Sequence, residues 1–161
     1  MDNTPEKVAT VIRTLRSSGI VCHLFGGWAE ELLSLREPGR HGDIDLIYCE
    51  ENFGQFDRAV KTIPEFVEVP LKRFRHKRAF KFLGTLCEVT LIQGTRERPT
   101  TLFWGEVPYV WASPLLHIEP VKIGMDPITV VSATNLELYR MLHKTTEPHR
   151  WREPQSLEPY E

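Results

Sequence analysis

Cysteine is scarce in this chain, and its three residues lie far apart in the sequence. Cys22, Cys49 and Cys87 each lie in an apolar, strand-like stretch, and their spacing matches no zinc-binding or redox motif. Free cysteines of this kind are usually small buried hydrophobic residues that stay reduced. We therefore assign no metal or redox chemistry to them.

The sequence also lacks an excess of positive charge and any long apolar run. Its formal net charge is −2, whereas a general nucleic-acid-binding surface is usually strongly basic, so nucleic acid is not an expected partner. No stretch reaches the length of about 18 apolar residues that a membrane-spanning helix needs. The first residues also lack the basic-then-apolar layout of a signal peptide. Together these absences predict a cytoplasmic protein.

The remaining composition is that of an ordinary globular protein. Hydrophobic residues make up 41% of the 161 residues and charged residues 26%, which predicts one domain, at residues 1–145. The segment 146–161 holds three prolines and many charges, a pattern typical of a C-terminal arm or of a partly disordered tail.

Hydrophobic periodicity predicts interspersed helices and strands. A helix begins at the Thr4-Pro5-Glu6 cap and ends at Gly19, and further helices are expected at 28–35, 52–62 and 133–144. Strands are expected at 20–25, 43–49, 66–69, 79–83 and 86–92, with weaker patterns at 107–111, 121–123 and 128–131. Several strands follow one another directly, which favours an α+β fold with a mixed sheet flanked by helices over a doubly wound sheet.

Two aspartates separated by one residue are the strongest chemical signal. Asp43 and Asp45 lie in the predicted strand 43–49, where alternation places both side chains on one face, with Cα atoms roughly 6.5–7 Å apart. Two carboxylates this close repel each other unless a cation lies between them, and Mg²⁺ prefers such oxygen ligands. The alternative is that Asp43 and Asp45 are exposed carboxylates at a strand end without a functional role. The pattern points to metal-dependent phosphoryl or nucleotidyl transfer.

A glycine pair precedes this strand. Gly26 and Gly27 would let the backbone approach a triphosphate, with N–H groups facing phosphate oxygens at the start of the next helix; a plain strand-to-helix turn would use the same residues. Arg40 and His41 lie just before the aspartates. His41 could orient an aspartate or approach a phosphate, or it could be a local structural hydrogen-bonding residue. Trp28 is expected to pack in the core.

Glu88 is the only acid in the apolar strand 86–92, where an unpaired buried carboxylate would be costly. A role in the site explains its presence, and an ion pair with a nearby lysine or arginine is the competing account. The basic cluster 72–78, KRFRHKR, could contact a triphosphate, bind RNA, or be a solvated connection between strands. The region 96–119 supplies aromatic residues that could line an acceptor pocket or form core.

These motifs together resemble the small antibiotic nucleotidyltransferases of the polymerase-β-like nucleotidyltransferase superfamily. The stretch FGGWA at 25–29, a short helix, and HGDIDL at 41–46 are similar in order and spacing to the signature of aminoglycoside 2″-nucleotidyltransferases and lincosamide nucleotidyltransferases. The strong similarity covers about residues 20–50. The resemblance implies the polymerase-β-like nucleotidyltransferase fold.

The resemblance also implies site roles and partners. Asp43 and Asp45 would hold Mg²⁺ against a nucleoside triphosphate, with ATP the expected nucleotide, and a third carboxylate would activate the hydroxyl of a small-molecule acceptor such as an aminoglycoside or lincosamide. Glu88 is the candidate for this third, catalytic carboxylate, although the family more often has aspartate there. Gly26, Gly27, Arg40 and His41 would bind the nucleotide. Relatives often form homodimers, so a homodimer is expected.

Two other functions stay open. The chain could be the nucleotidylating component of a toxin–antitoxin pair that modifies protein or RNA, although such proteins usually carry a Gly-Ser turn and Ser-Asp-x-Asp, which this chain lacks. It could also be a catalytically inactive module that binds nucleotide, because Glu88 departs from the usual aspartate.

Overall fold

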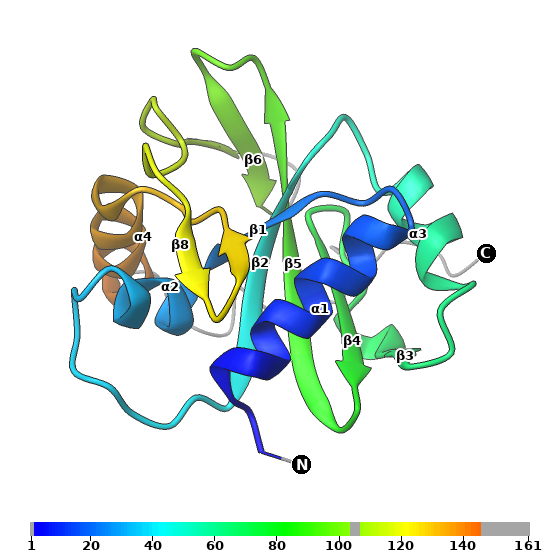
Figure 1. Cartoon of the computed structure of the whole chain (residues 1–161). Helices are drawn as coiled ribbons and strands as arrows, with labels where there is room; N and C mark the ends of the chain where they lie inside the picture. Colours follow the sequence, from blue (N-terminus) through cyan, green and yellow to red (C-terminus); the bar gives the residue numbers. More distant parts are fainter. Residues whose placement is uncertain (1, 104–106, 146–161) are drawn as a thin grey trace.

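A mixed seven-stranded sheet organises the residues that the structure describes, 2–103 and 107–145 (Figure 1). In this computed structural model the strand order is β1–β2–β5–β4–β3, with β6 joined to β5 and β7 to β6. The strands are β1 Cys22–Phe25, β2 Asp43–Cys49, β3 Phe66–Glu68, β4 Lys77–Phe82, β5 Thr85–Gly94, β6 Pro99–Phe103 and β7 Val107–Val110. Only the β2–β5 pair of this sheet is parallel.

Four α-helices accompany the sheet within the described residues: α1 Pro5–Ser17, α2 Gly26–Leu32, α3 Gly54–Val60 and α4 Ala133–Thr145. A short 3-10 helix, η1 Pro70–Lys72, precedes β4, and β8 Val121–Ile123 pairs with β9 Asp126–Ile128 as a separate hairpin. The expected α+β fold with a mixed sheet flanked by helices is therefore confirmed. The predicted arm at 146–161 lies outside the described residues.

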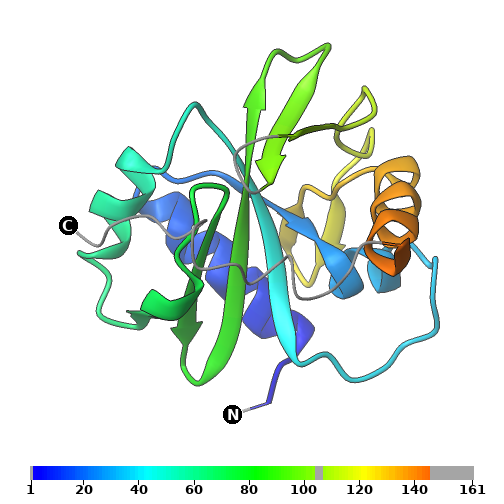
Figure 2. The same cartoon turned by 180° about the vertical axis from the view of Figure 1, so that it is seen from behind.

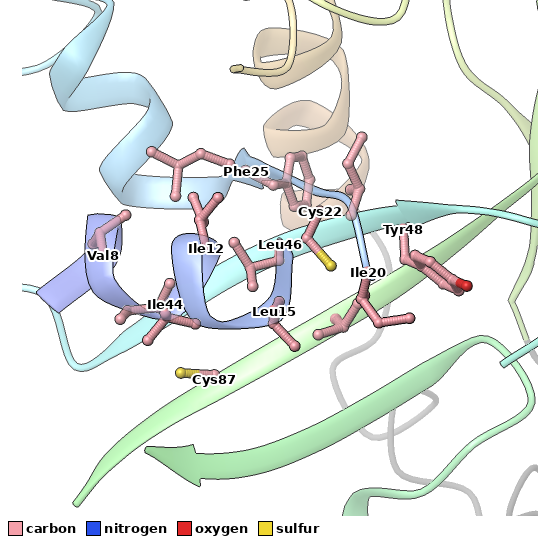
Figure 3. Close-up of a cluster of buried hydrophobic side chains, with 14 of the residues drawn as sticks. Val8, Ile12, Leu15, Ile20, Cys22, Phe25, Ile44, Leu46, Tyr48 and Cys87 are labelled. Atoms are coloured by element: carbon pink, nitrogen blue, oxygen red, sulfur yellow. The ribbon is translucent and has the colours of Figure 1, made fainter. Parts of the chain in front are cut away.

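Helix α1 covers one face of the sheet, and its sequence explains why. The Thr4 hydroxyl accepts a hydrogen bond from the Lys7 amide at 3.2 Å, and Pro5 occupies the first turn, as its sequence predicted. Figure 3 shows Val8, Ile12 and Leu15 pointing toward Ile44 and Leu46 of β2. Burying such aliphatic side chains stabilises the fold by about 1.5–3 kcal/mol each.

The even-numbered residues of β2 thus face α1, and the same face continues under α3. Tyr48 of β2 contacts Phe56 of α3, and Phe56 contacts Phe80 of β4, with ring centroids 5.5 and 6.2 Å apart. The odd-numbered Asp43 and Asp45 consequently point to the opposite face, where α2 and α4 lie toward the β1 edge (Figure 2). Side-chain alternation along β2 therefore places its core residues on the face that α1 covers and its two carboxylates on the opposite face.

Several predicted boundaries differ from the structure. Helix α2 begins at Gly26 itself, two residues before the predicted start, because no turn separates it from β1. Strand β6 had no sequence prediction, and the predicted strand 128–131 is the end of β9 followed by single bridges. Cys22 and Cys87 are buried as expected, but Cys49 at the end of β2 is exposed. Across the described residues, no helix is both long and apolar enough to cross a membrane.

His76 provides a test of burial through pH. Burial, and then the nearby Lys77 charge, lower the pKa of His76 to about 3, whereas an unfolded histidine titrates near 6.5. The unfolded state therefore binds the extra proton first, so stability falls as the pH drops below about 6.5. Between pH 7 and pH 5 we expect His76 to contribute a loss of about 2 kcal/mol.

Urea denaturation of wild type and H76F at both pH values measures this contribution. The phenylalanine keeps a ring against Phe74 and Phe103, and it should lose less stability on acidification than wild type. Equal losses in the two proteins would show that His76 does not stay neutral in the fold.

Candidate active site

Three carboxylates converge on the sheet face that α1 and α3 leave open. Asp45 of β2 is directly opposite Glu88 of the parallel strand β5, and Asp43 lies two residues before Asp45 on the same face. Carboxylate oxygens of Asp43, Asp45 and Glu88 all lie within 4.8 Å of one another. The predicted juxtaposition of these three residues therefore exists, and the β2–β5 register produces it.

The proximity of these carboxylates perturbs their ionisation. Burial, and then the Asp43 and Glu88 charges, raise the pKa of Asp45 to about 8. Burial and the Glu88 carboxylate likewise raise the pKa of Asp43. Both shifts have the sign expected for carboxylates that share more negative charge than their surroundings neutralise.

The glycine pair is shaped around this cluster. Gly26 has a φ of +65°, and a Cβ added there would lie 2.8 Å from the Cβ of Asp45, so only glycine permits the contact. A Cβ on Gly27 would lie 2.9 Å from Nδ1 of His41 and 3.1 Å from Nη1 of Arg36. The first turn of α2 is therefore packed directly against Asp45, His41 and Arg36.

His41 is held in place by local contacts. Its Nε2 lies 3.1 Å from Oε1 of Glu31, which also accepts a hydrogen bond from the Gly39 amide, and its ring packs on Trp28 with centroids 4.1 Å apart. These contacts fix the His41 ring, and its other nitrogen, Nδ1, faces Gly27. Arg40 is exposed, and it is Arg36, a residue with no sequence signal, that borders Gly27.

Asn3 is a second residue that sequence reasoning missed. Its Nδ2 donates hydrogen bonds to the carbonyl oxygens of His41 and Asp43, both at 2.9 Å, and its Oδ1 accepts one from Nε1 of Trp28 at 3.2 Å. Asn3 therefore ties the segment before α1 to the start of β2. No pattern in the sequence distinguishes it from any other asparagine near a helix cap.

Glu88 is paired with two lysines of the basic cluster. Nζ of Lys72 lies 2.5 Å from Oε1 of Glu88, and Nζ of Lys77 lies 2.7 Å from Oε2. Burial opposes the charged form of Glu88, but these two ammonium groups outweigh it and lower the pKa of Glu88. From the sequence, an ion pair and a role in the site were competing explanations for Glu88. The structure contains both the ion pairs and the position in the carboxylate cluster.

The arginines of the same cluster have a different role. Asp57 of α3 accepts hydrogen bonds from Arg73 at 3.0 Å and from Arg78 at 2.9 Å, and Arg73 also contacts Glu68 at 2.9 Å. Arg78 is 4% exposed and its guanidinium lies 4.3 Å from the ring centroid of Phe53. The arginines fix this segment to α3, so the expectation of a merely solvated connection is wrong.

The aromatic residues of the region 96–119 divide into two groups. Phe103 and Trp111 are buried and pack around Tyr139 of α4, whose ring stacks on Trp111 at 5.6 Å. His117 instead lines a cavity of about 690 Å³ beside Cys49 and Ile92. Cys49 and Ile92 lie opposite each other in β2 and β5, four residues after the Asp45–Glu88 pair. This spacing corresponds to about 13 Å along the strands, so the cavity is separate from the carboxylate cluster. Trp104 lies outside the described residues.

The donor set fits a hard divalent cation. Mg²⁺ prefers carboxylate oxygens and usually keeps positions for water and substrate phosphates. Asp43 and Asp45 offer such oxygens, and burial followed by the neighbouring carboxylate charges raises the pKa of both, a combination that a bound dication would offset. Glu88 differs because both of its oxygens already contact ammonium groups.

Comparison with known proteins connects this geometry to a fold. No protein-family model matches the sequence, and no curated protein matches it. The structure is similar to that of the lincosamide antibiotic adenylyltransferase LnuA bound to lincomycin, with 13% identity, a TM-score of 0.70, and coverage of 96% of this chain and 97% of LnuA. It is also similar to ANT(2″)-Ia in complex with adenylyl-2″-tobramycin, with 14% identity, a TM-score of 0.62, and coverage of 89% and 79%.

The fold expected from the motifs at residues 25–46 is therefore confirmed over almost the whole chain. The carboxylate cluster and the glycine turn lie in one site of this fold, on the face of the sheet opposite α1. The chain has the α+β nucleotidyltransferase fold that the lincosamide adenylyltransferase and ANT(2″)-Ia share.

Proposed function

We propose that the protein is a magnesium-dependent nucleotidyltransferase that transfers a nucleoside monophosphate from a nucleoside triphosphate to a hydroxyl of a small molecule. The observation that carries this proposal is the convergence of Asp43, Asp45 and Glu88 within 4.8 Å beside a glycine turn. The homodimer implied by the resemblance is part of the same proposal.

Each residue of the site has a role in this reaction. Asp43 and Asp45 would hold Mg²⁺, which when bound neutralises charge on the triphosphate oxygens. The first turn of α2, with Arg36 and His41 against Gly27, would orient the phosphates through N–H groups and positive charge. Positioning and charge neutralisation of this kind account for most of the catalysis in such transfers.

The covalent step is a substitution at the α-phosphorus. The acceptor oxygen forms the new bond, the bond from the α-phosphorus to the bridging oxygen breaks, and pyrophosphate leaves with that electron pair. Glu88 would accept the proton of the acceptor hydroxyl, for which it must come within about 2.6–3.2 Å of that oxygen. Lys72 and Lys77, which contact the two oxygens of Glu88, oppose this protonation through their positive charge.

An antibiotic is the acceptor class that we propose, as an aminoglycoside or a lincosamide. The support is the likeness to one structure that contains adenylyl-2″-tobramycin and another that contains lincomycin. ATP is the proposed nucleotide for the same reason, since the names of these structures refer to adenylyl groups.

A direct assay tests the proposal. We expect incubation with Mg²⁺, each nucleoside triphosphate, and a panel of aminoglycosides and lincosamides to release pyrophosphate and to add one nucleoside monophosphate to an acceptor, as measured by mass spectrometry. Chelation of the metal should stop both signals. Absence of pyrophosphate and of adduct across the panel would contradict the proposal.

The lysine pairing of Glu88 favours one alternative, a nucleotide-binding module without transfer. In that case Glu88 is only the partner of Lys72 and Lys77. The protein would then bind Mg²⁺ and ATP, would release no pyrophosphate, and would bind ATP with unchanged affinity after E88Q substitution.

A further inference from the structure

The basic cluster 72–78 holds cations of two kinds. Arg73 and Arg78 are directed at Asp57 and Glu68, away from the cluster. Lys72 on η1 and Lys77 at the start of β4 instead direct their ammonium groups to Glu88. Among the charges that act to lower the pKa of Asp43, those of Lys77 and Lys72 have the largest effects and that of His41 a smaller one. Both lysines therefore border the carboxylates as a group.

The side chains of the two lysines are more exposed than those of the arginines in the same segment. The Lys72 side chain is 43% exposed and that of Lys77 is 26% exposed, so their flexible stems reach the cluster from the solvent side. Arg73 and Arg78, next to them in sequence, are 12% and 4% exposed and bound to Asp57. The paired arginines anchor the segment on which the lysines are mounted.

The charges at the site indicate which anionic groups could replace Glu88 as partners of the two lysines. When all three carboxylates of the cluster are ionised, they carry −3, whereas the two ammonium groups carry +2. A triphosphate that arrives with one Mg²⁺ brings further negative oxygens, and a cation held by Asp43 and Asp45 would be repelled by the ammonium groups on the adjacent Glu88. An ammonium group is a compact charge that forms charge-assisted hydrogen bonds with phosphate oxygens as well as with carboxylates.

We propose that Lys72 and Lys77 exchange partners during the reaction, leaving Glu88 for the phosphate oxygens when the nucleotide and its cation bind, so that nucleotide binding frees Glu88 for the acceptor hydroxyl. This inference rests on the proposed function. It assigns the two lysines a positioning role in ordering the steps, since each ammonium group that leaves Glu88 removes a positive charge that opposes protonation of this carboxylate. It also explains why a basic cluster adjoins an acidic one.

The exchange predicts that removing either lysine will raise the affinity for a divalent cation and lower the affinity for the nucleotide. In K72M and in K77M, removal of a competing ammonium group should tighten binding of Mn²⁺ alone by roughly threefold to tenfold. The same change removes a phosphate contact, so binding of an α,β-methylene nucleoside triphosphate with Mg²⁺ should weaken by about tenfold or more. Electron paramagnetic resonance measures the Mn²⁺ affinity. Calorimetry with the α,β-methylene analogues of ATP, GTP, CTP and UTP, each with Mg²⁺, measures the nucleotide affinity.

Matched variants separate this exchange from damage to the fold. K122M removes an exposed lysine on β8, which packs against α1 on the other side of the sheet, and it should change neither affinity by more than about twofold. K72R keeps the charge and should restore most of the nucleotide affinity. A structural role for the lysines would instead lower both affinities in K72M and K77M.

The outcomes distinguish this inference from the proposed function. A wild-type protein that transfers nucleotide while K72M and K77M leave both affinities unchanged would overturn the exchange and leave the function standing. A parallel loss of both affinities would also overturn it. A wild-type protein that binds none of the magnesium–nucleotide analogues would overturn the proposed function, and the exchange with it.

Discussion

Substitution of Asp45 by asparagine is expected to reduce nucleotidyl transfer by about 10³-fold, because it removes a charged ligand that electrostatic catalysis at the α-phosphorus needs. The same substitution should make the protein more stable by about 1 kcal/mol, because it removes one of three carboxylates that crowd within 4.8 Å. Steady-state pyrophosphate release and thermal denaturation of D45N without added metal measure the two effects.

The control for this variant is E50Q, which removes an exposed acid immediately after the other end of β2. It should change transfer by less than about threefold and stability by less than about 0.5 kcal/mol. If D45N retains wild-type transfer, the carboxylate cluster is not the reaction centre. If D45N is strongly destabilised, Asp45 is a structural residue and not a functional one.

The largest effect on stability is expected from Asp57, which lies outside the carboxylate cluster. Its carboxylate receives hydrogen bonds from Arg73 and from Arg78, and Arg78 is 4% exposed. Replacing the carboxylate by an amide leaves a buried guanidinium charge without its neutralising partner and places an NH2 group where an oxygen accepted hydrogen bonds, so D57N should lose about 3 kcal/mol of unfolding free energy. Urea denaturation at pH 7 measures this loss.

Asp126 supplies a matched comparison for the same chemical change. It pairs with Arg13 at 2.6 Å, but the two side chains are 35% and 56% exposed, so D126N should cost less than about 1 kcal/mol. Similar losses in D57N and D126N would show that burial of Arg78 does not set the cost. Because Asp57 anchors the segment that carries Lys72 and Lys77, D57N should also weaken nucleotide binding.

The relation of Asp43 to Asp45 could be predicted from the sequence because it depends only on strand periodicity. Two residues one position apart on a strand share a face in any sheet. The placement of Glu88 beside them was suggested by the resemblance and by its isolation in an apolar strand, but it depends on register. A shift of β5 by one residue would have turned Glu88 toward α1.

The ends of the elements were less predictable from sequence. Helix α2 starts directly at Gly26, where the positive φ and the contact with Asp45 replace the turn that the glycine pair predicted. Strand β6 contains a proline and two threonines in five residues, which is a weak strand pattern. Its pairing with β5 and β7, not its own propensity, makes it a strand.

The sequence alone determined the shared face of Asp43 and Asp45 and the fold class, because side-chain alternation and hydrophobic period act over a few residues. Only the tertiary structure decided which charges meet there. Lys72 and Glu88 are 16 residues apart, and Asp57 and Arg78 are 21 apart. Such pairs form only after β4, β5 and α3 have packed, since Coulomb interactions act through space and leave no periodic trace along the chain.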